Sequence, residues 1–407
     1  MKLSSALSFS LLLATAQEAI AFTPSSSLAT QKKTQKIPSF SISPLLASSS
    51  DVEESTDDRR GFLTKVLGGA AATGIVANGI SVQGPSPYMP PVNSLNDKLI
   101  VITGGNTGLG LESAKRLATA GATIVLTSRS VEKGERAVQS VKDYVMEQTG
   151  QANDNIYTLP LDLCNLESVK SFPEKLKNSP AFQNRQSIDV LMNNAGVMAV
   201  PDLQITQDGY EKTFQSNHLG HFALTAGLEP LLNPNGSRVV NVSSMAHLIA
   251  SKGLDMENLN GEKDYQPWNA YGLSKLENIL FTKELQKRAD EAGKKITAVA
   301  LHPGAVRTDL PRYIVGEDKF VSMQDAQPSA ADILKLLPAF YFTKSVDRGA
   351  STQIYLSAFQ GGSEENVKGK FFFNMKDMKL NPAALDMEKA KDLWKVSEDM
   401  AGIKFNL

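Results

Sequence analysis

The segment from Lys98 to Arg129 constrains the folds open to this chain more than any other part of it. It holds two short apolar runs rich in β-branched residues, 99–102 and 122–127, as expected for strands buried on both faces of a parallel sheet. Between them, apolar residues recur at helical spacing at positions 111, 114, 117 and 118, and Gly121 ends that pattern. The segment therefore predicts a strand, a loop, a helix and a second strand.

The loop 103–110 joins the first strand to the helix and contains four glycines. Glycines permit a tight turn and let the backbone approach a pyrophosphate, whose charge is stabilised by the amides at the helix N-terminus. A glycine cluster alone is more often an ordinary turn, but here a strand precedes it and a helix follows it. We therefore expect a dinucleotide to bind at Gly104, Asn106, Thr107, Gly108, Leu109 and Gly110.

Composition argues against several classes of function. The formal net charge of the 407 residues is −1 and no basic block follows the N-terminal region, so nothing supports nucleic-acid binding. The single cysteine, Cys164, cannot form an internal disulfide, and none of the four histidines is paired with acidic residues at ligand spacing. We expect no metal site.

The N-terminal region has the composition of targeting segments rather than of a folded domain. Residues 1–21 combine one basic residue, an apolar core and a small-residue cleavage site, as in a signal peptide. Residues 22–58 begin with a stretch rich in Ser and Thr that has no acidic residue, as in a transit peptide. Together they resemble the bipartite plastid leaders of algae with secondary plastids. Simple secretion is the alternative, and the acid-free second segment argues against it.

Residues 59–95 carry a third signal. Arg59 and Arg60 precede a mild apolar stretch, 66–80, that resembles a twin-arginine signal for the thylakoid lumen. The stretch is short for a membrane span, so association with the thylakoid membrane on the stromal side is the alternative. An enzyme that needs a reduced dinucleotide is expected in the stroma, so the sequence predicts a plastid protein and leaves stroma and lumen open. Residues 84–91 are expected to form a stiff linker.

Strand and helix patterns alternate through the rest of the chain, which predicts one doubly wound α/β domain, a Rossmann domain with a parallel sheet, over residues 96–405. Further strands are expected at 156–161, 188–192, 238–242 and 296–301, and helices at 133–144, 166–176 (broken near Pro173), 210–232 and 271–292. A short segment, 311–344, interrupts this order before a C-terminal helix and is expected to form a lid. In such sheets ligands bind at the carboxyl ends of the strands.

The end of the second strand indicates which cofactor is preferred. Folds that select NAD place an acidic residue there to bind the ribose hydroxyl, whereas this chain has Ser128 followed by Arg129. A guanidinium matches the 2′-phosphate of NADP, although an ordinary surface arginine would give the same pattern. We expect NADPH or NADP to be the cofactor, with Arg129 at its 2′-phosphate.

Tyr271 and Lys275 lie four residues apart and therefore share one face of the predicted helix. Such a pair is often only a surface contact, but this one follows a strand that ends at Ser243 and Ser244. An ammonium near a phenol stabilises phenolate, so Lys275 is expected to lower the pKa of Tyr271. Tyr271 would then exchange a proton with a carbonyl oxygen held by Ser244, while a nicotinamide exchanges hydride with the carbon.

Taken in order, these motifs resemble the short-chain dehydrogenase/reductase family. The resemblance rests on Thr-Gly-x-x-x-Gly-x-Gly, Asn-Asn-Ala-Gly, the strand-end serine, Tyr-x-x-x-Lys and Pro303-Gly304, and it covers about residues 96–405. It implies that Asn217 is a fourth catalytic residue beside Ser244, Tyr271 and Lys275. It also implies cofactor contacts on the adenosine side at Asp162, Leu163, Asn194, Ala195 and Gly196, and at the nicotinamide end at Tyr271, Lys275, Pro303, Gly304, Val306 and Thr308.

Within the family the chain looks most like the retinol-dehydrogenase branch, on the run 242–247, the long gap from Ser244 to Tyr271 and the segment 274–281. Light-dependent protochlorophyllide reductase is a related plastid branch and is the second interpretation. A non-catalytic NADPH-sensing or assembly protein of the plastid is the third, and the intact catalytic set argues against it. His218, His221 and His247 are expected to be structural.

The expected substrate is large and apolar, of isoprenoid, retinoid or carotenoid type. This expectation comes from the plastid leader and from aromatic and aliphatic residues in the lid, with Phe340 and Tyr341 as substrate contacts. The same residues would equally suit a core or a membrane-facing patch. The family resemblance also implies a homodimer through the helices that carry Asn217 and Tyr271.

Overall fold

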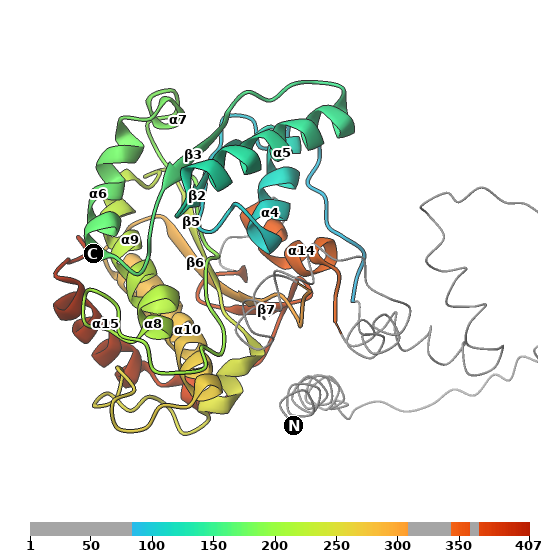
Figure 1. Ribbon diagram of the computed structural model, residues 1–407. Helices are drawn as coiled ribbons and strands as arrows, with labels where there is room; N and C mark the ends of the chain where they lie inside the picture. Colours follow the sequence, from blue (N-terminus) through green and yellow to red (C-terminus); the bar gives the residue numbers. More distant parts are fainter. Residues whose placement is uncertain (1–83, 308–342, 359–365) are drawn as a thin grey trace, which may run out of the picture.

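The computed structural model describes residues 84–307, 343–358 and 366–407 (Figure 1). The three expected leader segments, except for residues 84–95, lie outside these ranges, and so do most of the lid, Thr308, Phe340 and Tyr341. No helix of the described ranges has the length and apolarity needed to cross a membrane.

An eight-stranded sheet forms the centre of the molecule, in the order β3-β2-β1-β4-β5-β6-β7-β8 (Figure 1). Every neighbouring pair is parallel except β7 and β8, which are antiparallel. The strands are β1 (Leu99–Ile102), β2 (Thr123–Ser128), β3 (Ile156–Pro160), β4 (Val190–Asn193), β5 (Ser237–Val242), β6 (Ile296–His302), β7 (Phe371–Phe373) and β8 (Lys376–Asp377). This confirms the doubly wound sheet; β7 and β8 were not predicted.

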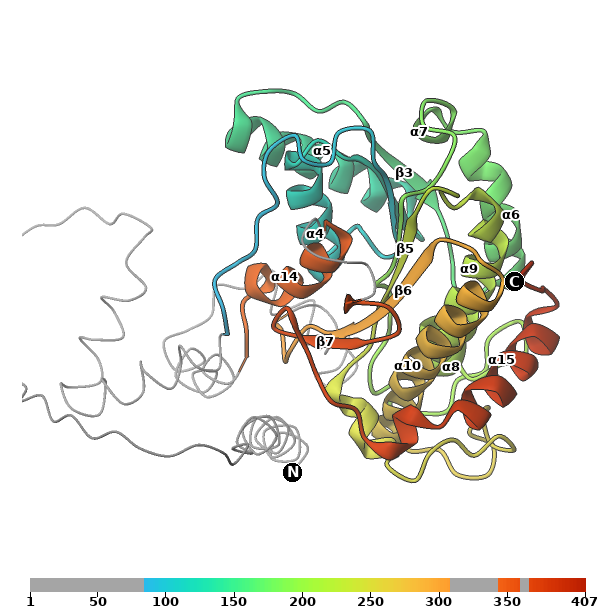
Figure 2. The same ribbon diagram turned by 180° about the vertical axis from the view of Figure 1, so that it is seen from behind.

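Helices cover both faces of the sheet (Figures 1 and 2). One face packs against α4 (Gly108–Thr119), α5 (Val131–Thr149) and α14 (Val346–Ser357). The other packs against α6 (Leu166–Lys177), α9 (Gly220–Leu228) and α10 (Pro267–Glu291), with α15 (Met387–Ala401) outside them. Shorter helices are α7 (Pro180–Gln183), α8 (Lys212–Phe214), the π-helical turn η1 (Gln215–Leu219), and the 3₁₀ turns η2 (Glu229–Leu231), η3 (Met245–Ala250) and η5 (Pro382–Leu385).

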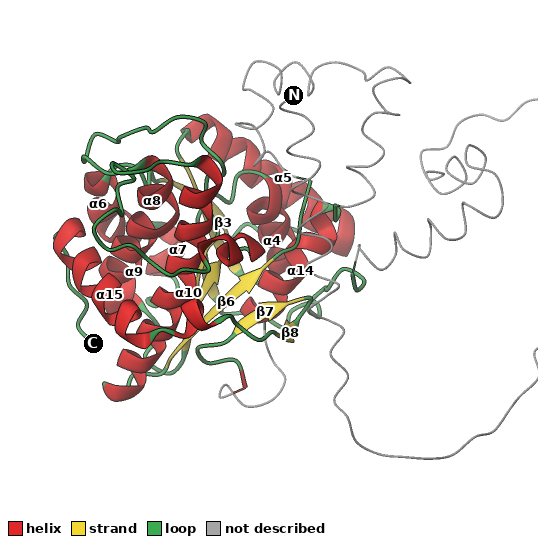
Figure 3. Ribbon diagram, turned by 90° about the horizontal axis from the view of Figure 1, so that it is seen from below, coloured by secondary structure: helices red, strands yellow, loops and turns green. Residues whose placement is uncertain are grey.

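The alternation of side chains along the strands explains this layering. In β1, Leu99 and Val101 belong to the core under α6 and α9, while Ile100 and Ile102 belong to the core under α4 and α14. Since both faces are covered, all four residues of β1 are buried, as a parallel strand requires. Figure 3 shows the sheet between the helices that cover it. Loops follow the carboxyl ends of the parallel strands, and the predicted residues Gly104, Asn194, Ser244 and Pro303 lie in the loops directly after β1, β4, β5 and β6.

Two expected helices differ from the structure. Helix α6 was expected to break near Pro173, but it continues to Lys177, and the proline ring packs beside Gly227 of α9, where no side chain opposes it. The expected long helix 210–232 is divided into α8, η1, α9 and η2, with the π-helical turn centred on Asn217. Both differences arise from contacts with distant parts of the chain, which local patterns do not encode.

The expected linker packs against the folded domain. Arg348 of α14 donates a hydrogen bond to the Gly84 carbonyl (2.9 Å), and the Tyr88 amide donates to Ser351 (3.0 Å). Buried Arg116 of α4 donates to the Tyr88 carbonyl (3.1 Å). Residues of the expected linker therefore contact the domain that was expected to begin at residue 96.

Helix α15 covers the outer face of α9 and α10 (Figure 2). Its Trp394 is 2% exposed, and the centroid of its ring lies 5.1 Å from that of Phe222 on α9 and 4.4 Å from that of Phe405. Helix α15 therefore packs on the two helices through which a dimer was expected, and the dimer itself stays a prediction.

Candidate active site

The glycine loop has the geometry that its sequence predicts. Gly104 and Gly108 have positive φ angles of +61° and +53°, which side-chain-bearing residues rarely adopt. A Cβ at Gly110 would lie 2.4 Å from the Gly104 carbonyl oxygen, so only glycine lets α4 start this close to the loop. The first turn of α4 has no acidic residue to repel an anion. A phosphate group fits this helix N-terminus.

Thr103 joins the glycine loop to the end of β4. Its hydroxyl oxygen accepts hydrogen bonds from the amides of Asn194 (2.8 Å) and Ala195 (3.0 Å). The Asn194 side chain donates to the Thr103 carbonyl (2.8 Å). The loops after β1 and β4 are therefore fixed to each other, and the amide of Asn194 holds the loop in addition to lining the expected cofactor site.

The expected adenosine side is formed by the ends of β2 and β3. Arg129 follows β2 directly, and its side chain is exposed, so it can reach a ligand phosphate. Asp162 is half-buried after β3, and its carboxylate accepts the Cys164 amide (3.0 Å). Leu163 is buried, and its carbonyl oxygen lies 2.6 Å from where a Cβ of Gly220 would be, so Gly220 is needed for this approach.

Ser244 and Tyr271 meet because α10 packs very closely on η3. Ser244 ends the connection from β5 and accepts the Ala246 amide (3.1 Å) at the start of η3. A Cβ at Gly272 would lie 2.7 Å from the Ala246 carbonyl oxygen, so glycine is required beside Tyr271. Tyr271 is 5% exposed and forms a side-chain hydrogen bond with Ser244.

The charges around Tyr271 differ from the sequence-based expectation. Burial raises the pKa of Tyr271 to about 12, and the hydrogen bond with Ser244 offsets only part of that effect. Burial lowers the pKa of Lys275 to about 8. The Lys275 ammonium donates to the Val242 carbonyl (3.1 Å) and lies 5.6 Å from the centroid of the Tyr271 ring. The expectation that the Tyr271 pKa lies below its ordinary value is therefore wrong for the free protein, because burial raises it.

Asn217 lies at the centre of the π-helical turn and is fully buried. Its side chain pairs with the backbone of Val197, accepting the amide (2.8 Å) and donating to the carbonyl (2.9 Å), and it also donates to Ser274 of α10 (2.9 Å). A Cβ at Gly196 would lie 3.0 Å from the Asn217 amide oxygen and 3.5 Å from the Lys275 nitrogen. Gly196, Asn217 and Lys275 are thus brought together, as the resemblance implies.

His221 holds the backbone of Asn217 and was not predicted to do so. Its Nδ1 lies 3.0 Å from the Asn217 carbonyl oxygen and its Nε2 lies 2.9 Å from the Thr103 hydroxyl. Because a carbonyl only accepts, Nδ1 carries the proton of the neutral ring, and Thr103 then donates to Nε2. Burial lowers the pKa of His221 to about 4, which keeps the ring neutral.

The other two histidines expected to be structural also have internal partners. His218 lies 2.9 Å from the Ser397 hydroxyl of α15, and His247 lies 2.7 Å from the Ser244 carbonyl. Within the described ranges, no three His, Cys, Asp or Glu side chains lie close enough together to hold a metal ion.

The end of β6 forms the expected nicotinamide side. Pro303 and Gly304 turn the chain, and Gly304 has a φ of +99°. The side chain of Val306 packs near Gly349 of α14 and Leu109 of the glycine loop. No sequence pattern singled out Lys344, whose side chain lies against this turn.

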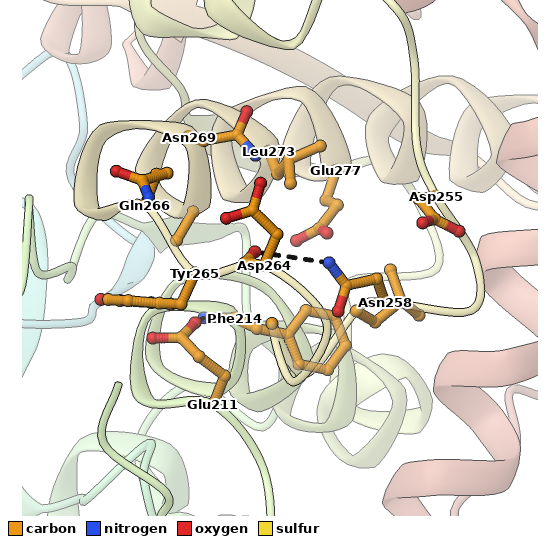
Figure 4. A pocket seen from close by; sticks show the side chains of 13 residues that line it. Glu211, Phe214, Asp255, Asn258, Asp264, Tyr265, Gln266, Asn269, Leu273 and Glu277 are labelled. Atoms are coloured by element: carbon orange, nitrogen blue, oxygen red, sulfur yellow. Dashed lines mark hydrogen bonds between the residues drawn. The ribbon is translucent and has the colours of Figure 1, made fainter. Parts of the chain in front are cut away.

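A separate cavity of about 20 Å³ lies between α8, α10 and the loop 255–266 (Figure 4). Its lining residues include four acids, Glu211, Asp255, Asp264 and Glu277, and none of the predicted site residues. Burial and the nearby Glu211 raise the pKa of Glu277 well above its usual value, and its Oε2 atom has no hydrogen-bond partner. The predicted site residues therefore lie elsewhere, at the strand ends.

A doubly wound sheet with this glycine cradle, and with a serine, a tyrosine and a lysine around one point at its carboxyl edge, defines an oxidoreductase that uses a nicotinamide dinucleotide. The chain belongs to the short-chain dehydrogenase family, whose model, described as short chain dehydrogenase, matches residues 98–318.

The chain is similar to several curated proteins over most of their length. Retinol dehydrogenase 14 of Mus musculus is 37% identical over 314 residues, which cover 76% of this chain and 87% of that protein. Retinol dehydrogenase 12 of Homo sapiens is 36% identical, with 76% and 88% covered. Among solved structures, an uncharacterized protein from Mycobacterium Paratuberculosis matches with a TM-score of 0.57 and 32% identity, covering 80% of this chain and all of that one. The chain is thus a short-chain dehydrogenase that acts on alcohols and resembles retinol dehydrogenases.

Proposed function

We propose that this protein is an NADP(H)-dependent oxidoreductase that interconverts a carbonyl and an alcohol on a large apolar substrate of isoprenoid type. The observation that carries the proposal is the intact assembly of Ser244, Tyr271, Lys275 and Asn217 at the edge of the sheet. A protein that only bound the cofactor would have no need of a buried phenol beside a strand-end serine.

The residues support the following division of roles. The bound nicotinamide supplies or accepts the hydride. In the direction of reduction, the neutral Tyr271 phenol gives its proton to the carbonyl oxygen, which becomes the alcohol oxygen, and the Ser244 hydroxyl holds that oxygen by a hydrogen bond. The Lys275 ammonium lies beside Tyr271, where it donates to the Val242 carbonyl. Asn217 holds the neighbouring backbone at Val197 by hydrogen bonds.

Preference for NADPH is supported by the exposed Arg129 at the end of β2 and by the absence of an acid at that position. Substituting Arg129→Ala should weaken NADPH binding by about tenfold while leaving NADH binding nearly unchanged, because a charge-assisted contact to phosphate is lost. Arg136→Ala is a matched control, since Arg136 is also exposed and pairs with Glu132 on α5. Equal weakening of both cofactors would contradict this assignment.

The apolar substrate class is supported by the similarity to retinol dehydrogenases. The test is NADPH oxidation with retinal, apocarotenals and protochlorophyllide, in light and in the dark, with Tyr271→Phe as the control. The protein should begin at residue 84, because residues 84–95 pack on the domain. Turnover that disappears in the variant is expected. Tight NADPH binding without turnover would favour the sensing or assembly role, and light-dependent turnover of protochlorophyllide would favour the second interpretation.

We also propose a plastid location, supported by the composition of residues 1–58. Fusions of residues 1–58 and 1–83 to a fluorescent protein would test it, because the longer fusion includes the twin-arginine-like segment. Secretion of both fusions would contradict the proposal, and arrival of only the longer one in the thylakoid lumen would assign the compartment.

A further inference from the structure

The backbone of Lys344 pairs with the turn that follows β6. Its backbone amide donates to the Ala305 carbonyl (2.7 Å), and its carbonyl accepts the Arg307 amide (3.2 Å). These bonds pair Lys344 with Val306 in a parallel bridge. Lys344 is therefore next to the cofactor turn, although it is about forty residues away in sequence.

The Lys344 side chain runs back along that turn and is 4% exposed. Its Cδ and Cε atoms lie 2.8 Å from where a Cβ of Gly304 would be, so the aliphatic part of the side chain covers the glycine. Its ammonium donates to the Pro303 carbonyl (3.3 Å) and to the side-chain oxygen of Asn374. It also lies 4.4 Å from the centroid of the Phe373 ring. One side chain thus contacts the turn, the end of β7 and the hairpin that joins β7 to β8.

The contacts around this ammonium are unusual for a buried cation. The salt bridges of the described residues do not include Lys344, and its hydrogen-bond acceptors are uncharged oxygens. His302 stacks on the same Phe373 ring, with a centroid distance of 4.7 Å. Burial and the neighbouring Arg348 lower the pKa of Lys344 to about 8. Burying a charge is costly, so an ammonium held on uncharged acceptors of the described residues is a candidate for a specific role.

We propose that Lys344 is a positioning residue, which fixes the Pro303–Gly304 turn against the β7–β8 hairpin and so shapes the nicotinamide end of the cofactor site. This inference rests on the proposed function, because it requires a nicotinamide dinucleotide at the carboxyl edge of the sheet. Lys344 acts through the turn and through Asn374, and it takes no part in the proton transfer assigned to Tyr271.

The two ends of the cofactor site depend on different parts of the chain, which gives a specific test. The adenosine side is built by the glycine loop, Arg129 and Asp162, whereas the turn held by Lys344 belongs to the end of β6. A ligand that lacks the nicotinamide, such as 2′,5′-ADP, should not depend on Lys344. NADPH should depend on it.

The experiment compares Lys344→Met with Lys376→Met, a control on β8 whose lysine is exposed. We would measure the dissociation constants of NADPH by fluorescence and of 2′,5′-ADP by calorimetry, with kcat and KM for the best substrate. The Lys344 variant should bind NADPH about tenfold more weakly, as expected when hydrogen bonds from a charged donor are lost, and should bind 2′,5′-ADP as the wild type does. Lys376→Met should change neither constant.

Asn374 provides a second pair of variants in case Lys344→Met does not fold. Asn374 has a positive φ of +52°, which glycine adopts freely and aspartate tolerates. Asn374→Gly removes the oxygen that accepts the Lys344 hydrogen bond and should weaken NADPH binding, while Asn374→Asp keeps an acceptor and should retain it.

Equal weakening of NADPH and 2′,5′-ADP, or unchanged NADPH binding in both Lys344→Met and Asn374→Gly, would overturn the assignment of Lys344. Failure of the wild-type protein to bind NADPH would instead overturn the proposed function and the inference that rests on it.

Discussion

The pKa of Tyr271 gives the sharpest test of how the site works. In the free protein, burial raises it from 10 to about 12, which disfavours phenolate by roughly 3 kcal/mol. At neutral pH almost all molecules then carry the neutral phenol. Without cofactor, Tyr271 is therefore a proton donor over the whole neutral range.

Lys275 does not change this conclusion for the free protein. Burial lowers its own pKa to about 8, which weakens the positive charge that Lys275 can present to Tyr271. The side-chain nitrogen of Lys275 also donates a hydrogen bond to the Val242 carbonyl (3.1 Å). We therefore expect Lys275→Met to leave the titration of Tyr271 almost unchanged.

The assay is an ultraviolet titration of tyrosinate in the cofactor-free protein, with Tyr271→Phe subtracted from wild type. The difference should show one group that titrates near pH 12, and the same result should be obtained in the Lys275→Met background. A group that titrates below about pH 9, and that moves upward when Lys275 is removed, would refute the argument from burial and restore the sequence-based expectation.

Three further predictions concern packing and buried charge. Trp394→Ala should lower the free energy of unfolding by about 3–5 kcal/mol in denaturant titrations, because it removes a fully buried ring from between α9, α10 and Phe405; Lys395→Ala on the exposed side of α15 is the control. The pKa of Glu277 is raised in the folded state, so the unfolded chain releases this proton at a lower pH than the folded protein does. The wild type therefore loses stability as pH rises above 4.5. Glu277→Gln lacks this proton release and should become more stable relative to wild type over the same pH range. A constant difference across pH would contradict this. Gly272→Ala should lower kcat strongly while cofactor affinity changes little, because a Cβ 2.7 Å from the Ala246 carbonyl oxygen must separate Tyr271 from Ser244; full activity would show that α10 can shift without cost.

Local sequence patterns predicted much of the fold because a parallel strand and a glycine loop are encoded by adjacent residues. Strand β1 lies at 99–102 as the pattern predicted, and α4 begins at Gly108, within the expected loop 103–110. Tyr271 and Lys275 were found by spacing, and Asn217 only through resemblance to a family. Its role depends on a π-helical turn that is stabilised by contacts with Val197 and Ser274, far away in sequence.

The features that were missed depend on distant contacts. Strand β7 is only three residues long, which is too short for a clear sequence pattern. Residues 84–95 have the composition of a linker, yet Arg116 and Arg348 bind their backbone carbonyls. Lys344 and His221 gain their roles from backbone groups that no residue pattern reports. The direction of the Tyr271 pKa shift was wrong because spacing reveals a neighbour and says nothing of the depth of burial.

The position of α15 has a consequence for how the protein is made. A chain is synthesised from its N-terminus, so α15 is made after every residue of α10. Until the residues of α15 leave the ribosome, the outer face of the helix that carries Tyr271 and Lys275 lacks its cover, and Phe222 and Phe281 have no Trp394 against them. A stop codon or a protease cut just before Met387 would therefore leave every catalytic residue in the chain and still yield a protein that exposes an aromatic surface to chaperones and proteases.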